Sequence, residues 1–285
     1  GGQDIDDDYG DYADRAMVAL KVFDTYVVGA YDFVHSGPVA DDVGQVFGQP
    51  HDLGDMDDVQ QVVLSIFQRP LSASEKAERS VSLREELKPA FDWGFYGVFR
   101  SQELDIGQDD YGFWIENGGA QHFDQFELVP RHAQAFIPDL WLRYQKRFDH
   151  NSGIRVEAEA AGIFGTIDNV TDNRSTTTQE REIQQFGAAV EVAYDQGGLT
   201  VGLDGGFATG DEAEYFGVKD QPVLANPDTG EINREVTNFK FDRNYHVDLM
   251  LFREVIGAVT NATYVKPYVA YDFFPAPEDA LGLRL

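Results

Sequence analysis

Apolar and polar side chains alternate along most of the chain, in segments of about ten residues. The clearest pair of segments is Ile183–Tyr194 and Leu199–Ala208, which flank the short, turn-forming stretch Asp195–Gly198. In each segment, one set of alternate positions is apolar and the other set is polar or small. Because successive side chains of a strand point to opposite faces of a sheet, this pattern predicts a β-hairpin with one apolar face.

The same period of two predicts about nine strands in the whole chain. Besides the hairpin, the candidate strands are Arg15–Phe23, Tyr26–Val34, Phe91–Gln102, Leu140–Phe148, Ile154–Ala160, Tyr245–Leu251 and Val265–Phe273. Strands of this kind suit a membrane-crossing barrel, where a tilted strand needs about 9–11 residues. We therefore expect an all-β fold made of long antiparallel strands.

One region departs from the alternation. Apolar residues within Val59–Ile66 follow the i, i+3, i+4, i+7 spacing of an amphipathic helix, and acidic residues precede them. A second helix is predicted over Ser74–Leu87, because Ser72 and Glu75 match a capping box. We therefore expect a helical insertion over residues 41–90, as a plug, a loop at the mouth of a barrel or a periplasmic lobe.

The connections between candidate strands alternate in length. Asp149–Gly153 and Asp195–Gly198 are tight, whereas residues 168–181 and 210–238 are long, polar and acidic. Short turns at one end and long loops at the other are typical of outer-membrane barrels. A further strand at Gly112–Ile115 would move the helical insertion from the short-turn end to the long-loop end, and the sequence leaves both arrangements open.

Half-apolar strands fit two architectures. In a soluble sandwich the apolar faces pack together and the polar faces meet water, whereas in a membrane barrel the apolar face meets lipid and the polar face lines a lumen. Opposite charges on the polar positions, aromatic residues near strand ends and the length of the strands favour the barrel. We predict an antiparallel transmembrane β-barrel in which residues 1–285 form a single domain.

Composition narrows the range of functions. The chain has 285 residues with 22 Lys and Arg against 50 Asp and Glu, a net charge of -28, which argues against nucleic acid as a partner. The absence of Cys excludes disulfides, thiolate metal sites and Cys nucleophiles. No apolar run approaches the roughly 18–20 residues of a membrane helix. Because the chain begins Gly1-Gly2-Gln3, we expect it to be a processed product or a fragment.

Six short segments, spread over nearly the whole chain, carry a family resemblance: Asp57–Val59, Asp92–Gln102, Ile137–Trp141, Arg155–Ala160, Phe241–Asp248 and Val259–Tyr264. They resemble an uncharacterised family of myxobacterial outer-membrane β-barrels. Thr209–Asp211, followed by Phe241-Asp242, is more distantly similar to alginate-export-type porins. The resemblance implies a passive barrel in the outer membrane of a Gram-negative bacterium, with no established substrate.

The end of the chain departs from that pattern. Such barrels usually finish in a strand with a terminal aromatic residue, whereas this chain finishes in Leu281–Leu285. We therefore expect the barrel to be incomplete in this chain, with strands missing at one or both ends.

Charged residues at polar strand positions are the candidate functional residues. The predicted lumen-lining set is Arg100, Arg143, Arg147, Arg155, Glu157, Glu159, Glu191, Asp204, Asp242, His246, Asp248 and Lys266. Two interpretations stay open. The basic residues form a ladder that attracts anions, as charged pore rings do, or they form salt bridges with the glutamates that stiffen the wall.

Two other groups of residues have a chemical interpretation. Asp242, His246 and Asp248 share one face of a candidate strand and suit an acid–base or metal site, although no Ser lies on a strand face beside His246. The acidic N-terminal stretch from Asp4 resembles a calcium loop, but Arg15 stands where a bidentate Glu is expected. We favour lumen-lining polar residues for the first group. For the second we favour a solvated acidic stretch that binds divalent cations loosely.

The expected function is therefore a porin-like outer-membrane channel for transport. It passes or binds small hydrophilic solutes, anionic ones included, by passive diffusion, and its partners are the membrane lipid and the solute. We expect neither catalysis nor a cofactor. The alternatives are a barrel hydrolase using Asp242, His246 and Asp248, a non-conducting structural or surface-interaction barrel, and a soluble β-sandwich.

Overall fold

The computed structural model describes residues 14–34, 40–41, 51–52, 59–106, 128–168, 180–210, 235–242, 245, 247 and 259–272. Most of them belong to strands, which are β1 (Asp14–Val22), β2 (Thr25–Val34), β3 (Ala40–Asp41), β4 (His51–Asp52), β5 (Val59–Gln68), β6 (Ala90–Ile106), β7 (Leu128–Arg147), β8 (Ser152–Asp168), β9 (Glu180–Gln196), β10 (Leu199–Ala208), β11 (Glu235–Val236) and β12 (Ala262–Tyr271). One described helix, α2 (Ala73–Arg84), joins β5 to β6.

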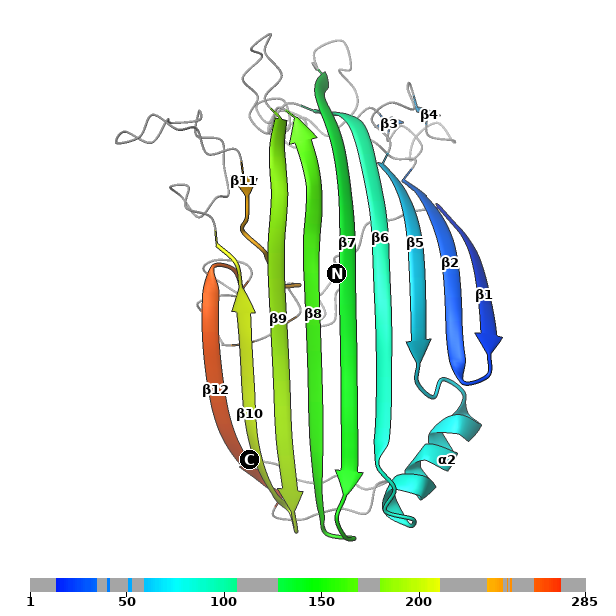
Figure 1. Cartoon of the computed structure of the whole chain (residues 1–285), viewed down its shortest axis with the longest axis vertical. Helices are drawn as coiled ribbons and strands as arrows, with labels where there is room; N and C mark the ends of the chain where they lie inside the picture. Colours follow the sequence, from blue (N-terminus) through cyan, green and yellow to red (C-terminus); the bar gives the residue numbers. More distant parts are fainter. Residues whose placement is uncertain are drawn as a thin grey trace, which may run out of the picture.

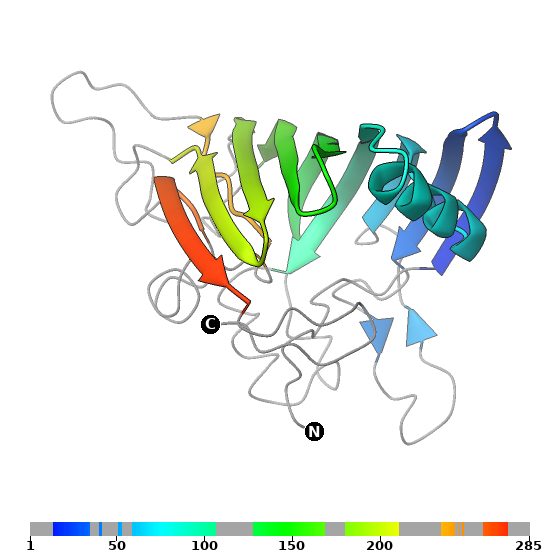
Figure 2. The ribbon, with the colours of Figure 1, turned by 90° about the horizontal axis from the view of Figure 1, so that it is seen from below.

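The main sheet places nine strands side by side in the order β1-β2-β5-β6-β7-β8-β9-β10-β12, and each neighbouring pair is antiparallel. β11 adds a short parallel pairing beside one end of β9, and β3 pairs only with β4. Figure 2 shows the main sheet as one curved layer whose edge strands, β1 and β12, lie apart. The all-β antiparallel prediction is confirmed, and the sheet is not closed.

Short turns gather at one end of the sheet, as predicted (Figure 1). Phe23 and Asp24 connect β1 to β2, and Gly197 and Gly198 connect β9 to β10. Both glycines have positive φ, 56° and 94°, which suits the two-residue hairpin turns that match the twist of antiparallel strands. The opposite end carries long connections, including residues 107–127 and 209–261, and the short-turn end carries one long connection of its own, residues 69–89 with α2.

The helix predicted at Val59–Ile66 is wrong, because these residues form β5. Their apolar residues fit both periods, since Val62, Leu64 and Ile66 also occupy every second position, as residues on one face of a strand do. Pairing with β2 on one side and β6 on the other decides in favour of the strand. Within the predicted insertion at 41–90, the described helical part is α2 alone.

The predicted second helix is confirmed. Ser72 is the N-cap of α2 and accepts a hydrogen bond from the Glu75 backbone, while the Glu75 side chain accepts one from the Ser72 backbone. α2 lies at the short-turn end of the sheet (Figure 1). The candidate strand Gly112–Ile115 lies outside the described residues. So does most of Tyr245–Leu251, and the described Tyr245 and Val247 are not in a strand.

Strand register sorts the side chains of the main sheet onto two different faces. One face, called here the apolar face, carries large apolar side chains from all nine strands: Val18, Leu20, Tyr31, Val62, Leu64, Phe99, Phe136, Leu140, Phe164, Phe186, Val190, Val201, Leu203, Val265 and Val269. These side chains are exposed. The other face, called here the polar face, carries most of the charged residues together with a small buried apolar cluster of Ala30, Val63 and Val98.

Candidate functional site

Charged residues from six neighbouring strands lie in one row across the polar face. Their direct cross-strand order, from β6 to β12, is Asp92, Arg143, Glu157, Glu191, Asp204 and Lys266. Partners in an antiparallel pair lie on the same face with their Cβ atoms about 4.5–5.5 Å apart, so each member lies within reach of the next. We call these six residues the charged row.

The β6 end of the charged row is a buried ion pair. Asp92 is 1% exposed, and Oδ2 accepts hydrogen bonds from Arg143 Nη2 at 2.8 Å and from Nε at 3.2 Å. Arg79 of α2 places Nη1 3.0 Å from the other oxygen, Oδ1. Because a buried carboxylate is costly without partners, these two guanidinium groups account for the presence of Asp92 in this position and tie α2 to the sheet.

The middle of the charged row is bridged by a residue from the next row. Arg155 donates to Glu157 at 2.8 Å and to Glu191 at 3.2 Å, so it separates two carboxylates that are direct cross-strand partners. Trp141 Nε1 also donates to Glu157, at 2.7 Å. At the β12 end, Lys266 Nζ lies 3.6 Å from Asp204. Of the two interpretations of the basic residues, the structure favours ion pairs for Arg143, Arg155 and Lys266.

The remaining predicted residues are distributed more widely. Arg147 lies at the short turn, where it donates to the His150 carbonyl at 3.0 Å, and Arg100 lies on the polar face opposite Gln61 and Ala135, towards the long-connection end. Glu159 lies beside the charged row, opposite Trp141. Asp242 is outside the strands, and His246 and Asp248 lie outside the described residues.

Sequence reasoning missed three acidic residues of the polar face. Asp92 belongs to the charged row, and Asp139 lies on the polar face opposite Tyr96. Asp32 forms a second buried pair: it is 2% exposed and accepts hydrogen bonds from Arg15 at 2.6 and 2.7 Å. The sequence pattern already indicated a polar-face position for Asp92. It is an even number of residues from Arg100 in the same strand, so the two side chains point to the same face.

Aromatic rings cover glycines on the polar face of the β9–β12 region. A Cβ added to Gly206 would lie 2.4 Å from the Tyr264 ring, and one added to Gly202 would lie 2.1 Å from the Tyr268 ring. These are direct cross-strand partners, so each ring lies flat over the backbone opposite it. The Tyr264 hydroxyl also contacts the hydroxyl of Tyr245, which brings part of the β11–β12 connection against the polar face.

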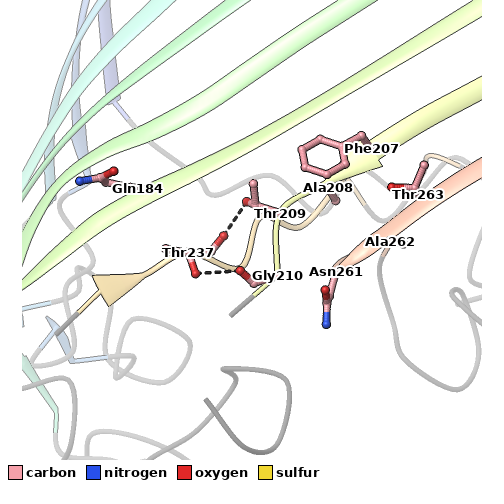
Figure 3. A pocket seen from close by; sticks show the side chains of 9 residues that line it. All are labelled: Gln184, Phe207, Ala208, Thr209, Gly210, Thr237, Asn261, Ala262 and Thr263. Atoms are coloured by element: carbon pink, nitrogen blue, oxygen red, sulfur yellow. Dashed lines mark hydrogen bonds between the residues drawn. The ribbon is translucent and has the colours of Figure 1, made fainter. Parts of the chain in front are cut away.

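A recess of 330 Å³ lies at the long-connection end, between the ends of β10 and β12 (Figure 3). Thr209 organises it: its hydroxyl donates to the Thr237 carbonyl at 2.5 Å and accepts from the Phe186 backbone at 3.1 Å. Thr237 in turn donates to the Gly210 carbonyl at 2.7 Å. The residues that line this recess are neutral, so it is a structural junction between the sheet and residues 235–242.

No three His, Asp or Glu side chains among the described residues gather as a metal-binding cluster. Across the same parts of the chain, no helix is long and apolar enough to span a membrane.

No family model, curated protein or solved structure matches this chain. The resemblances to myxobacterial outer-membrane barrels and to alginate-export-type porins therefore stay predictions.

Proposed function

We propose that this chain forms an antiparallel transmembrane β-barrel in the outer membrane of a Gram-negative bacterium. It acts there as a porin-like channel for small hydrophilic solutes. The apolar face lies against lipid, and the polar face lines a water-filled lumen through which solutes diffuse passively. The proposal includes no catalytic step and no cofactor. The observation that carries it is the separation of the two faces over all nine strands of the main sheet.

The exposure of the apolar face supports lipid as its surroundings. Val18 is 65% exposed, and Val265 and Val269 are each 68% exposed. Soluble monomers rarely expose a continuous apolar patch larger than a few hundred Å². A soluble sandwich would cover this face with a second sheet, and within the described residues the only other sheet is the short β3–β4 pair. In hydrocarbon surroundings these apolar side chains can stay exposed on the surface of the sheet without contacting water.

The two edge strands of the sheet constrain the number of strands in the proposed barrel. In hydrocarbon each unpaired backbone group costs several kcal/mol, so a membrane sheet has to close. Nine successive antiparallel strands leave β1 and β12 running in the same direction. Antiparallel closure then requires an odd number of additional strands, which agrees with the even strand numbers of bacterial barrels and with the expectation of further strands.

Planar-bilayer recording tests the channel. The purified chain, folded in detergent and added to a lipid bilayer, is expected to give discrete current steps. The heat-denatured chain serves as the control. Protein that inserts into the bilayer without carrying current would favour a non-conducting structural barrel, and a stable monomer in detergent-free buffer would favour a soluble sandwich.

A further inference from the structure

Five basic side chains of the polar face are neutralised by carboxylates. Each of the following has an ion-pair partner: Arg15 with Asp32, Lys21 with Glu75, Arg143 with Asp92, Arg155 with Glu157 and Glu191, and Lys266 with Asp204. The opposite charges of an ion pair largely cancel, so the pair contributes little to the electrostatic field farther away. The field in the lumen therefore depends on the charges that remain after pairing.

Those remaining charges are negative. On the polar face of β6–β10 and β12, the rows from Ala90 to Tyr96 hold six carboxylates and three basic side chains. The carboxylates are Asp92, Asp139, Glu157, Glu159, Glu191 and Asp204, and the basic residues are Arg143, Arg155 and Lys266. Arg79 of α2 adds one positive charge near Asp92 and leaves the surplus negative.

The excess is concentrated at Asp139 and Glu159. Asp139 on β7 and Glu159 on β8 are diagonal neighbours on the polar face, because their direct cross-strand partners are Ala161 and Trp141. No basic side chain among the described residues forms an ion pair with either one. They lie on β7 and β8, beside the charged row, in the central part of the wall.

We propose that the lumen selects cations, so that the solutes it passes are small hydrophilic cations and neutral molecules rather than anions. This inference rests on the proposed channel function, and it replaces the expectation that anionic solutes are included. It concerns the electrostatic field of the wall, which a low-dielectric surface concentrates in a narrow opening. The net charge of the whole chain, -28, has the same sign.

The reversal potential in a KCl gradient tests the inference. A wall potential of about one kT raises K⁺ and lowers Cl⁻ each by a factor of e, so the permeability ratio is expected to favour K⁺ by about sevenfold at low salt. The double variant Asp139→Asn/Glu159→Gln is expected to lower that ratio by about half, because it removes the negative charge of both neighbouring carboxyl groups from the polar face. Glu86→Gln is the matched control, since Glu86 lies beyond α2 and pairs with Lys88.

The outcomes separate the inference from the channel itself. A K⁺ preference that falls in the double variant Asp139→Asn/Glu159→Gln and persists in Glu86→Gln supports the inference. Current with an anion preference, or with none, overturns the inference and leaves the channel intact. The absence of any current from the inserted wild-type chain overturns both. Since the wild-type measurement decides the sign of the selectivity, the test does not depend on the folding of a variant.

Discussion

At the scale of single residues, the polar face is held together by arginines that cross from one strand to the next. Asp92 and Asp32 are almost fully buried, and each is bound by a guanidinium group from a neighbouring strand. Burying a charge is favourable only when good geometry offsets its lost hydration. These pairs therefore specify which strands are neighbours, in addition to any stability that they contribute.

Arg143→Met tests the buried pair. The variant keeps much of the side-chain length but leaves Asp92 with Arg79 as its remaining ion-pair partner, so we expect a loss of roughly 2 kcal/mol in the free energy of unfolding. Urea unfolding in lipid vesicles measures it. Arg147→Met is the control, because Arg147 donates to a turn carbonyl, and its loss is expected to stay within about 0.5 kcal/mol. Equal losses in the two variants would contradict this account.

Adjacent glycines of β10 provide a second residue-scale test. A Cβ at Gly206 would collide with the Tyr264 ring, whereas one at Gly205, on the apolar face, would meet its nearest atom at 3.5 Å. We expect Gly206→Ala to cost about 1–3 kcal/mol and Gly205→Ala less than 1 kcal/mol. The same unfolding measurement compares them, and a Gly206→Ala variant as stable as Gly205→Ala would show that the ring does not need this space.

At the scale of elements, α2 is a helix held by polar contacts rather than by a buried face. None of its residues is buried. Glu75 accepts hydrogen bonds from the Leu71 and Ser72 backbone at 2.9 and 3.0 Å and pairs with Lys21 of β1. Farther along, Arg79 reaches Asp92 of β6. A short helix with little apolar packing is marginal alone, so these contacts to the two strands determine where it lies.

The Glu75 contacts make α2 sensitive to acid. The Lys21 ammonium, together with the Ser72 and Leu71 backbone N–H groups, holds the pKa of the Glu75 carboxyl well below its ordinary value of 4.5. Stability from these contacts is therefore complete above pH 4.5 and is lost as the pH falls below it towards the folded-state pKa. We expect amide hydrogen exchange in α2, corrected for intrinsic rates, to accelerate over that range.

Glu75→Gln identifies the group responsible for that change. The variant is expected to exchange faster than the wild type at pH 7 and to show a flatter dependence on pH below 4.5. Glu78→Gln, on the same helix, is the control and is expected to keep the wild-type profile. A Glu75→Gln profile that follows the wild type would assign the acid sensitivity to another group.

Elements whose signal is local were predictable from the sequence. The β9–β10 hairpin follows from a two-glycine turn between alternating segments, and α2 follows from its capping box. β5 was not predictable, because its apolar residues fit both helical and strand periods, and only pairing with β2 and β6 separates the two. The local pattern of apolar residues therefore predicts an element only where that pattern fits the helical period or the strand period, but not both.

The sequence predicted several of the charged residues that share the polar face, but not which of them form ion pairs with one another. Alternation placed Arg143, Arg155 and Glu157 at polar positions, and the structure puts them on one face. Alternation cannot supply register, and register determines that Arg143 binds Asp92, 51 residues earlier in the chain, instead of a glutamate. The surplus of negative charge became visible only once each basic residue had a named partner.

At the scale of the whole molecule, the account requires two solvents. The apolar face is exposed on every strand of the main sheet, while charged side chains gather on the opposite face. Exposed apolar surface in water promotes association, and buried charge in hydrocarbon is costly, so this sheet is stable when lipid is on one side and water on the other. The proposed barrel, its channel function and its cation selectivity all depend on lipid lying against the apolar face and water against the polar face.

Spin labelling at two consecutive positions of β10 tests this placement most directly. The chain contains no Cys, so Leu203→Cys and Asp204→Cys each introduce a single labelling site. With the protein in lipid vesicles, a nitroxide at 203 is expected to collide mainly with lipid-dissolved oxygen, and a nitroxide at 204 mainly with a water-soluble nickel reagent. A nitroxide at 203 that is shielded from both reagents, or reached mainly by the nickel reagent, would contradict the account.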